Sequence, residues 1–397
     1  MVLMLPQRLT FDPQRDSEFF AEVPPRPAVF LLRGESGEPY VSKSSNLWRR
    51  VQRLLAQNEG ISRRLNLRER ARVLEYQLTG SDFESGLLLY KILRAEFPKT
   101  YENRLRLRMT PLVRFHLENR YPRVSVTTKL GSAKSESIYY GPFPSRAAAE
   151  KFANDSLDFF KMRRCVEELN PDPAFPGCVY SEMKMCLAPC FKGCTDEEYA
   201  DEVARVREFL DSSGQSLIRE ITLERDQASE DMHFETAALL HAKLEKLKPV
   251  VSQLPVIVQR IDRLVALMVQ PSADPDSVTL FRINGGRFSL PVQLPLNLAQ
   301  EAGGKPLSME ARIQEVLAEV EVPQASAQET MEQLAILKRW YYRTSKLGEL
   351  FLADDRGDLP WRRIVRGVTR VFKGEKEVPD LSESAKDYWL FRAKVRD

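Results

Sequence analysis

The sequence predicts an α/β plus α protein with five parts: a small mixed α/β domain, a β-rich segment, a cysteine-rich segment, a helical hairpin and a C-terminal α+β region. Short runs of β-branched and aromatic residues, bounded by Gly and Pro, alternate with longer stretches of helical apolar spacing. All five cysteines fall between residues 165 and 194. With 43% apolar residues, the 397-residue chain can bury a core and has room for two or three domains.

The first region reads as a hairpin followed by helices. A Pro- and charge-rich arm covers residues 1–25. A turn containing Gly34 and Gly37 separates two β-rich runs, and Asn46 can cap the helix that follows. Pro98 ends the last helix of this region. The expected elements are strands over 27–32 and 39–42 and helices over 46–55, 62–77 and 83–97.

The elements after residue 105 are predicted from the same kinds of signal: helix caps, turns and apolar spacing. Thr195 and Glu198 form a capping box for a helix, and Asn284-Gly285-Gly286 is typical of a hairpin turn. The expected strands cover 112–117, 124–130, 138–140, 264–269 and 277–292, and the expected helices cover 145–163, 196–210, 216–246 with a bend at 233–235, 309–320 and 328–345. The predicted regions are therefore 1–25, 26–105, 106–164, 165–195, 196–255 and 256–397.

Charge is unevenly distributed along the chain. The net charge is only +3, but residues 41–130 hold 19 Lys or Arg against 8 Asp or Glu, a local charge of +11. Residues 195–240 hold 13 Asp or Glu against 4 Arg, a local charge of −9. Two segments of opposite sign indicate two different partners, an intramolecular contact, or simply solvated helix faces.

The clustered cysteines point to a metal or cluster site. Cys165, Cys178, Cys186 and Cys190 are separated by 12, 7 and 3 residues. A disulfide framework fits poorly, because such frameworks belong to small secreted domains. Zinc and a 4Fe-4S cluster both take four thiolates, so spacing alone does not choose between them, and four unligated thiols are the remaining alternative. Cys194 could replace Cys190 as a ligand.

No apolar run is long enough for a membrane helix, and Pro6 interrupts the short apolar start of the chain. These features predict a cytoplasmic protein with no membrane partner.

Several ordered blocks resemble the UvrC family, the GIY-YIG incision subunit of bacterial nucleotide excision repair. The blocks cover about residues 25 to 250, and their shared order makes the resemblance specific. They are residues 27–30 (PAVF), 40–43 (YVSK) with 46–47 and Arg50, 121–122, 140–144 (YGPFP), the cysteine spacing ending in 186–190 (CLAPC), and a UVR-like hairpin around 231–238 (DMHFETAA).

The resemblance implies a one-metal endonuclease site in the first domain. In the family, a Glu holds a divalent cation such as Mg²⁺, a Tyr orients water, and an Arg and a Lys neutralise the phosphate. Tyr40, Lys43 and Arg50 match the second tyrosine, the lysine and the arginine. DNA binding is expected from Lys43, Arg49, Arg50 and Arg53.

Four positions depart from the family pattern. The first motif loses its glycine at Ala28 and its tyrosine hydroxyl at Phe30, and the second motif has Ser42 in place of glycine. The glutamate position falls on Leu89, or on Tyr90 if the register shifts by one. The sequence therefore predicts inactive remnants that still bind phosphate and leaves enzymatic activity uncertain.

For the other segments, the resemblance favours a structural 4Fe-4S cluster on Cys165, Cys178, Cys186 and Cys190 over zinc. It also implies that Met232, Phe234, Ala237 and Ala238 contact a UvrB-like protein, whereas an ordinary hairpin would bury these side chains in its own core. The family's RNase H-like and helix-hairpin-helix domains are expected to be absent.

The main hypothesis is thus a UvrC-like repair protein that binds DNA and a UvrB-type partner. A single-incision GIY-YIG endonuclease, using a carboxylate such as Glu84, is the first alternative. A redox- or iron-sensing module that does not bind DNA is the second.

Overall fold

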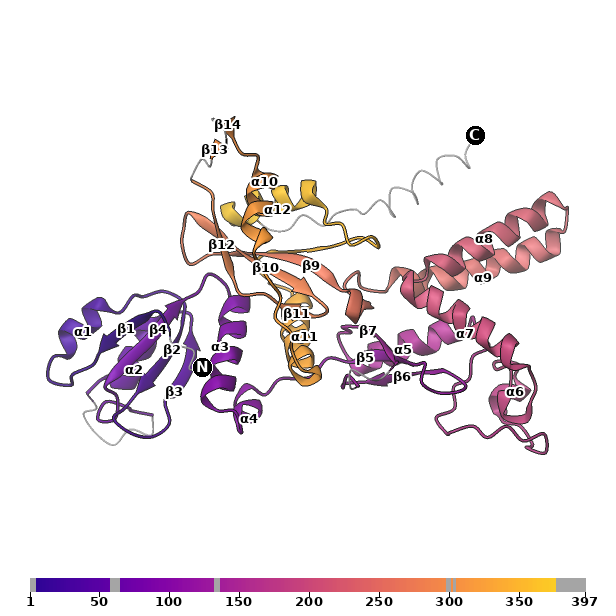
Figure 1. Ribbon diagram of the computed structural model, residues 1–397, viewed down its shortest axis with the longest axis horizontal. Helices are drawn as coiled ribbons and strands as arrows, with labels where there is room; N and C mark the ends of the chain where they lie inside the picture. Colours follow the sequence, from indigo (N-terminus) through magenta and orange to yellow (C-terminus); the bar gives the residue numbers. More distant parts are fainter. Residues whose placement is uncertain (1–4, 58–64, 132–135, 298–300, 303–304, 376–397) are drawn as a thin grey trace.

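The computed structural model describes residues 5–57, 65–131, 136–297, 301–302 and 305–375. Figure 1 shows an N-terminal region, a central C-terminal region and, on the far side, a β-sheet that leads into a protruding helical hairpin. The mixed α/β class is confirmed, with antiparallel sheets and helices packed on their faces.

The N-terminal region is a four-stranded antiparallel sheet with helices on both faces. The strand order is β1-β4-β2-β3, so β3 is an edge strand. Apolar side chains of β2 alternate between a core on the α1/α2 face, which includes Phe30 and Leu32, and a core on the α3 face, which includes Val29 and Leu31. The elements are β1 (Gln7–Thr10), α1 (Asp16–Glu22), β2 (Ala28–Arg33), β3 (Tyr40–Ser44), α2 (Leu47–Leu55), β4 (Val73–Leu78) and α3 (Asp82–Glu96).

Two expectations for this region are wrong. The predicted arm belongs to the domain, because β1 pairs with β4 and the side chains of Phe11, Phe19 and Val23 are buried. The predicted helix over residues 62–77 is also incorrect where the structure describes it: the chain forms β4 there, and residues 58–64 lie outside the described part. The hairpin of β2 and β3 and the helices α2 and α3 are confirmed.

The middle region contains a second antiparallel sheet of order β6-β5-β7-β8, in which β8 comes from a later part of the chain. The capping box of Thr195 and Glu198 is confirmed at the start of α7. Its elements are α4 (Tyr101–Leu105), β5 (Leu112–His116), β6 (Arg123–Thr127), β7 (Ile138–Gly141), α5 (Arg146–Leu157), α6 (Val179–Glu182), the 3-10 turn η1 (Pro189–Phe191), α7 (Asp196–Asp211), α8 (Gln215–Glu230), α9 (Phe234–Ser252) and β8 (Gln259–Arg260).

The C-terminal region is a third antiparallel sheet, in which β10 pairs with β9, β11 and β12. Alternate side chains of β9 and β10 face α10 and α12 on one side and α11 on the other. Gly285 and Gly286 both have positive φ, which the turn between β10 and β11 requires. The elements are η2 (Ile261–Arg263), β9 (Val265–Pro271), β10 (Ser277–Asn284), β11 (Arg287–Phe288), β12 (Val292–Pro295), β13 (Glu301–Ala302), β14 (Lys305–Pro306), α10 (Met309–Ala318), α11 (Ala327–Tyr341), β15 (Glu349–Leu352) and α12 (Trp361–Lys373).

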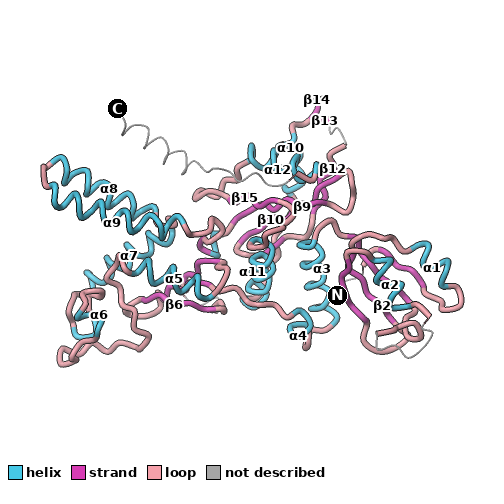
Figure 2. The backbone as a smooth tube through the Cα atoms, turned by 180° about the vertical axis from the view of Figure 1, so that it is seen from behind, coloured by secondary structure: helices cyan, strands magenta, loops and turns pink. Residues whose placement is uncertain are grey.

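Helix α11 of the C-terminal region packs against α3 of the N-terminal region (Figure 2). The Phe83 ring of α3 lies 5.2 Å from the rings of Phe281 and Phe288 and 6.0 Å from that of Trp340. This aromatic group is buried, so the contact resembles a domain core rather than a loose surface contact.

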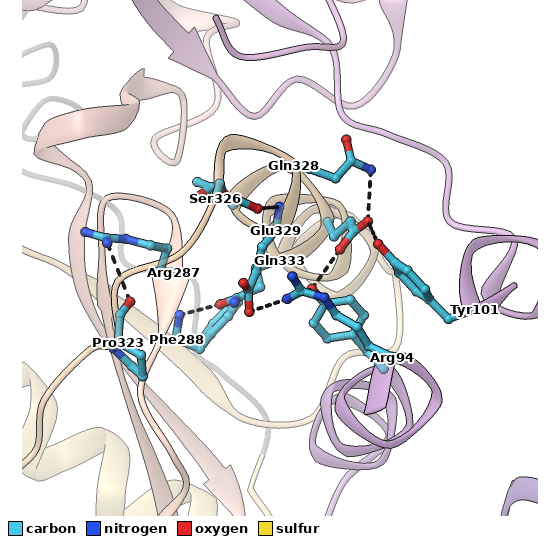
Figure 3. Close-up of polar contacts among 12 residues, drawn as sticks. Arg94, Tyr101, Arg287, Phe288, Pro323, Ser326, Gln328, Glu329 and Gln333 are labelled. Atoms are coloured by element: carbon cyan, nitrogen blue, oxygen red, sulfur yellow. Dashed lines mark hydrogen bonds and ion pairs between the residues drawn. The ribbon is translucent and has the colours of Figure 1, made fainter. Parts of the chain in front are cut away.

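A polar cluster accompanies this apolar contact (Figure 3). The carboxylate of Glu332, which is fully buried, accepts hydrogen bonds from the hydroxyls of Tyr90 at 2.7 Å and Tyr101 at 2.8 Å. Beside it, Arg94 of α3 forms an ion pair with Glu329 of α11 at 2.6 Å. Burial, with the nearby Glu332, raises the pKa of Tyr101 to about 12.

Candidate nucleic-acid interface

The first pair of predicted site residues meets at the edge strand β3. Asn46 caps α2 by accepting the backbone N–H of Arg49 at 2.9 Å, which fixes the first turn of the helix beside the strand. Arg50 in this turn donates a hydrogen bond to the Tyr40 hydroxyl at 2.7 Å. The side chains of Arg49 and Arg53 are exposed on the same helix. The structure therefore brings Tyr40 and Arg50 together next to exposed basic groups.

Lys43 lies on the other side of the same strand. Successive side chains of a strand alternate, and Tyr40 packs with the α2-face core whereas Val41 packs with the α3-face core. Lys43 has the same parity as Val41 and forms an ion pair with Asp82, the first residue of α3, at 2.5 Å. The predicted catalytic set is thus divided: Tyr40 and Arg50 lie together, whereas Lys43 lies on the other face and pairs with Asp82, which was not predicted.

A pocket of about 110 Å³ lies beside Lys43, between the N-terminal region and α11. Its polar lining includes Lys43, Asp82 and three arginines, and its apolar lining includes Leu89. The second carboxylate oxygen of Asp82 accepts from Arg343 at 2.5 Å, so this acid is held between cations of two regions. The arginines of the pocket are Arg104, Arg339 and Arg343.

The candidate positions for a metal-binding carboxylate have different surroundings. Leu89 lines the pocket and offers only an aliphatic side chain. Tyr90 is buried and donates its hydroxyl to Glu332, so it serves the contact with α11. Glu84 is 4% exposed, does not line the pocket and accepts the backbone N–H of Gly80 at 2.8 Å. Burial raises the pKa of Glu84 to about 7.

The first-motif ring is buried beneath the tyrosine of the second. Phe30 is fully buried, faces Ser42 across the hairpin and lies with its ring 6.1 Å from that of Tyr40. Without a hydroxyl it can pack but cannot hold a water molecule.

The cysteine-rich segment forms turns around its thiols. The backbone N–H of Ala188, a residue with positive φ, donates to the sulfur of Cys186 at 3.3 Å, and the buried Arg163 guanidinium donates to the sulfur of Cys165 at 3.6 Å. Burial, with the nearby thiols of Cys165, Cys190 and Cys178, raises the pKa of Cys186 to about 11.

These thiols have the donor chemistry of a zinc or iron–sulfur site. In the part of the chain that the structure describes, however, no three His, Cys, Asp or Glu side chains are arranged to hold a metal ion.

The α8/α9 hairpin exposes apolar side chains at its tip. The side chains of Met232 and Phe234 are 75% and 67% exposed, Ala238 is also exposed and Ala237 is partly buried. The hairpin therefore does not bury Met232 and Phe234 in its own core. An exposed apolar tip on a long, protruding hairpin is typical of a protein-contact site.

Two contributions to the pocket were missed by reasoning from the sequence. No role was predicted for Asp82, which directly precedes the helix expected over 83–97, and no site was assigned to the tail that contains Arg339 and Arg343. The sequence offers one signal, the basic and aromatic stretch Lys338-Arg339-Trp340-Tyr341-Tyr342-Arg343. This stretch lies near Lys43 because α11 packs on α3, and no sequence pattern indicates a contact between segments so far apart in the chain.

Family models match two adjacent parts of the chain. Residues 111–209 match the middle domain of the UvrC/Cho excinucleases, and residues 215–248 match the UvrB/UvrC motif known as UVR. No solved structure matches. No helix of the described residues is both long and apolar enough to cross a membrane.

Curated relatives agree with these matches. UvrABC system protein C of Alcanivorax borkumensis is 29% identical over 242 residues, covering 60% of this chain and 39% of the relative. The protein of the same name from Idiomarina loihiensis is 28% identical over 59% of this chain and 38% of its own length, and that from Carboxydothermus hydrogenoformans is 28% identical over 58% and 38%. The matched part is about two fifths of each relative.

Proposed function

Because the chain is related to the UvrC family through its middle domain and UVR motif, we propose that it acts in nucleotide excision repair in the cytoplasm, binding DNA and a UvrB-type partner. In this proposal, the GIY-YIG-like site of the N-terminal region is degraded and binds DNA phosphates without cutting the strand. The basic side chains of β3, α2 and α11 supply the DNA-binding surface.

One observation carries the proposal of a degraded site: Leu89, at the position of the family's glutamate, lines the pocket beside Lys43. A leucine cannot supply the carboxylate that Mg²⁺ takes from proteins. The alternative register provides no ligand either, since the Tyr90 hydroxyl is engaged with Glu332. Glu84, the proposed substitute ligand, has its carboxylate buried against Gly80.

A nicking assay tests this proposal against the single-incision endonuclease. The full chain is incubated with damaged duplex DNA and Mg²⁺ or Mn²⁺, and we expect binding without nicking above background. Asp82 is the carboxylate that lines the pocket, so Asp82→Ala and Arg50→Ala are the informative variants. Nicking that both substitutions abolish would establish an active nuclease.

The proposed partner contact uses the tip of the α8/α9 hairpin. Met232→Ala and Phe234→Ala are expected to weaken binding to a UvrB-type protein by about tenfold or more, since buried interface aromatics often dominate affinity. Leu223→Ala is the matched control, because Leu223 is 71% exposed on α8 but lies two turns before its end. Equal effects of the tip and control variants would exclude the tip as the contact.

The proposed cofactor is a structural 4Fe-4S cluster, with zinc as the alternative, on Cys165, Cys178, Cys186 and Cys190. Such a group would fix a segment that has few buried apolar side chains. The described structure does not hold three of these thiols in a metal-binding arrangement, so binding would have to draw them together. Metal analysis and visible absorbance of protein purified without oxygen distinguish iron from zinc. Cys186→Ser should lose the metal and Cys194→Ser should keep it; a metal-free wild-type protein would contradict the proposal.

A further inference from the structure

The pocket beside Lys43 collects positive charge from three separate segments. Lys43 comes from β3, Arg104 from α4, Arg339 from the last turn of α11 and Arg343 from the loop directly after that helix. Among the lining residues, Asp82 is the one carboxylate. Four cations around one acid leave an excess of positive charge that has to be balanced by solvent ions or by an anionic ligand.

Asp82 links a cation of the N-terminal region to a cation of the C-terminal region. Its two carboxylate oxygens accept from Lys43 and from Arg343, each at 2.5 Å, and its side chain is 53% exposed. A carboxylate that accepts hydrogen bonds from a lysine and an arginine has the kind of partners that a phosphate group would take. Because about half of the Asp82 side chain is exposed to solvent, a competing anion can reach its ion pairs.

The other two arginines are available without breaking this arrangement. Arg339 is exposed and makes no ion pair within the described residues. Arg104 is paired with the exposed Glu38 at 2.7 Å, and its guanidinium lies over the Phe97 ring, 3.7 Å from the ring centroid. These groups add positive charge at the mouth of the pocket.

The positions of these cations are set by buried structure. Helix α11 is fixed on α3 by the Phe83 and Trp340 rings and by the buried Glu332. Arg339 and Trp340 are neighbours on this helix, so the arginine is held near Lys43 by the packing of the tryptophan. A preorganised group of cations loses little conformational freedom when it binds an anion.

We propose that this pocket binds a phosphate group, which displaces Asp82 from Lys43 and Arg343. Asp82 is then a built-in counter-ion that occupies the cations until phosphate arrives. The phosphate comes either from a DNA strand, in which case the inference rests on the proposed function, or from free phosphate in solution. In the opposing interpretation, the ion pairs only join the two regions and no anion enters.

The test uses the full chain and four variants. Binding is measured by fluorescence anisotropy with a labelled single-stranded oligonucleotide, with and without a 5′-phosphate, over a series of salt concentrations. Inorganic phosphate is measured separately by calorimetry. Asp82→Asn and Arg339→Ala test the pocket, Arg343→Ala tests the ion pair, and Arg366→Ala on α12 removes an exposed arginine outside the pocket.

We expect Asp82→Asn to tighten phosphate or oligonucleotide binding by about two- to fivefold, and Arg339→Ala to weaken it by a similar factor. If the pocket substitutions change the binding of inorganic phosphate but not that of the oligonucleotide, the ligand is free phosphate. If they change the binding of the oligonucleotide, the ligand is a phosphate of the DNA strand. Arg339→Ala breaks no ion pair, so it tests the proposal even if Asp82→Asn weakens the fold.

The inference is overturned if Asp82→Asn and Arg339→Ala change binding no more than Arg366→Ala does. If DNA binds but ignores both pocket substitutions, only this inference fails. If the wild-type chain binds inorganic phosphate through Arg339 but no DNA at low salt, the proposed function fails and the phosphate site stands.

Discussion

At the scale of single residues, Glu84 is a buried acid that forms no ion pair with any residue that the structure describes. Its carboxylate accepts one backbone N–H, from Gly80, and its residue is 4% exposed. Desolvation raises its pKa from the ordinary 4.5 to about 7, although the hydrogen bond from Gly80 opposes this shift. The native state therefore binds the proton more tightly than the unfolded chain does.

This raised pKa predicts a pH-dependent stability. Between pH 4.5 and 7 the native chain holds the Glu84 proton and the unfolded chain loses it, so this contribution to the free energy of unfolding falls as pH rises. Glu84→Gln keeps an oxygen for Gly80 and cannot ionise. Chemical denaturation should show a gain on the order of 2 kcal/mol at pH 8 and little change at pH 5.

Glu315→Gln on the exposed surface of α10 is the control and should change stability little at either pH. A gain of equal size at both pH values for Glu84→Gln would mean that Glu84 is not protonated in the native state.

Within the candidate site, contacts between residues close in sequence are easier to predict than contacts between distant segments. The closeness of Tyr40 and Arg50 followed from a strand that leads directly into a capped helix, which is local information. That Lys43 pairs with Asp82, and that Arg343 meets the same acid, depends on which faces of β3 and α11 are covered. Such contacts are distant in sequence and leave no periodic signal.

At the scale of elements, the segment 65–78 shows how a helical pattern can mislead. Arginines and leucines there favour helix, yet Leu74 and Tyr76 are buried on the α2 face while β4 pairs with both β1 and β2. Pairing with two neighbouring strands and burial of Leu74 and Tyr76 outweigh the local helix propensity. Caps were more reliable, because Asn46 and Thr195 each accept a backbone N–H at the helix start that they predict.

Two glycines on helical elements should respond oppositely to alanine. Gly214, between α7 and α8, has a φ of +89°, and an added Cβ would lie 2.3 Å from a methyl group of Val251. Gly86 on α3 has open space around it. We expect Gly214→Ala to lower the free energy of unfolding by about 2 kcal/mol, and Gly86→Ala to raise it by about 0.5–1 kcal/mol.

Denaturant titration of both variants measures these changes. A neutral Gly214→Ala would show that the junction of α7 and α8 relaxes easily and does not fix the direction of the hairpin.

At the scale of the whole molecule, helices that are far apart in sequence pack together: α11 lies on α3, and the bonded residues Tyr90 and Glu332 are 242 positions apart. Figure 3 shows the polar part of this contact, where Tyr101 and Gln328 point to the same buried carboxylate. No local pattern in the sequence indicates the pairing. The same contact places Arg339 of α11, and Arg343 directly after it, in the pocket that Lys43 lines, so the proposed phosphate site depends on it.

Removing Glu332 should therefore loosen two distant helices together. Glu332→Ala leaves the buried hydroxyls of Tyr90 and Tyr101 without their acceptor, and we expect a loss of about 2–4 kcal/mol in the free energy of unfolding. Glu332→Gln keeps one acceptor oxygen and should lose less, and Glu315→Ala is the exposed control. Hydrogen exchange should lose protection in both α3 and α11 while α8 and α9 are unchanged. Loss confined to α11 would show that α3 is stable without it and that the two regions fold independently.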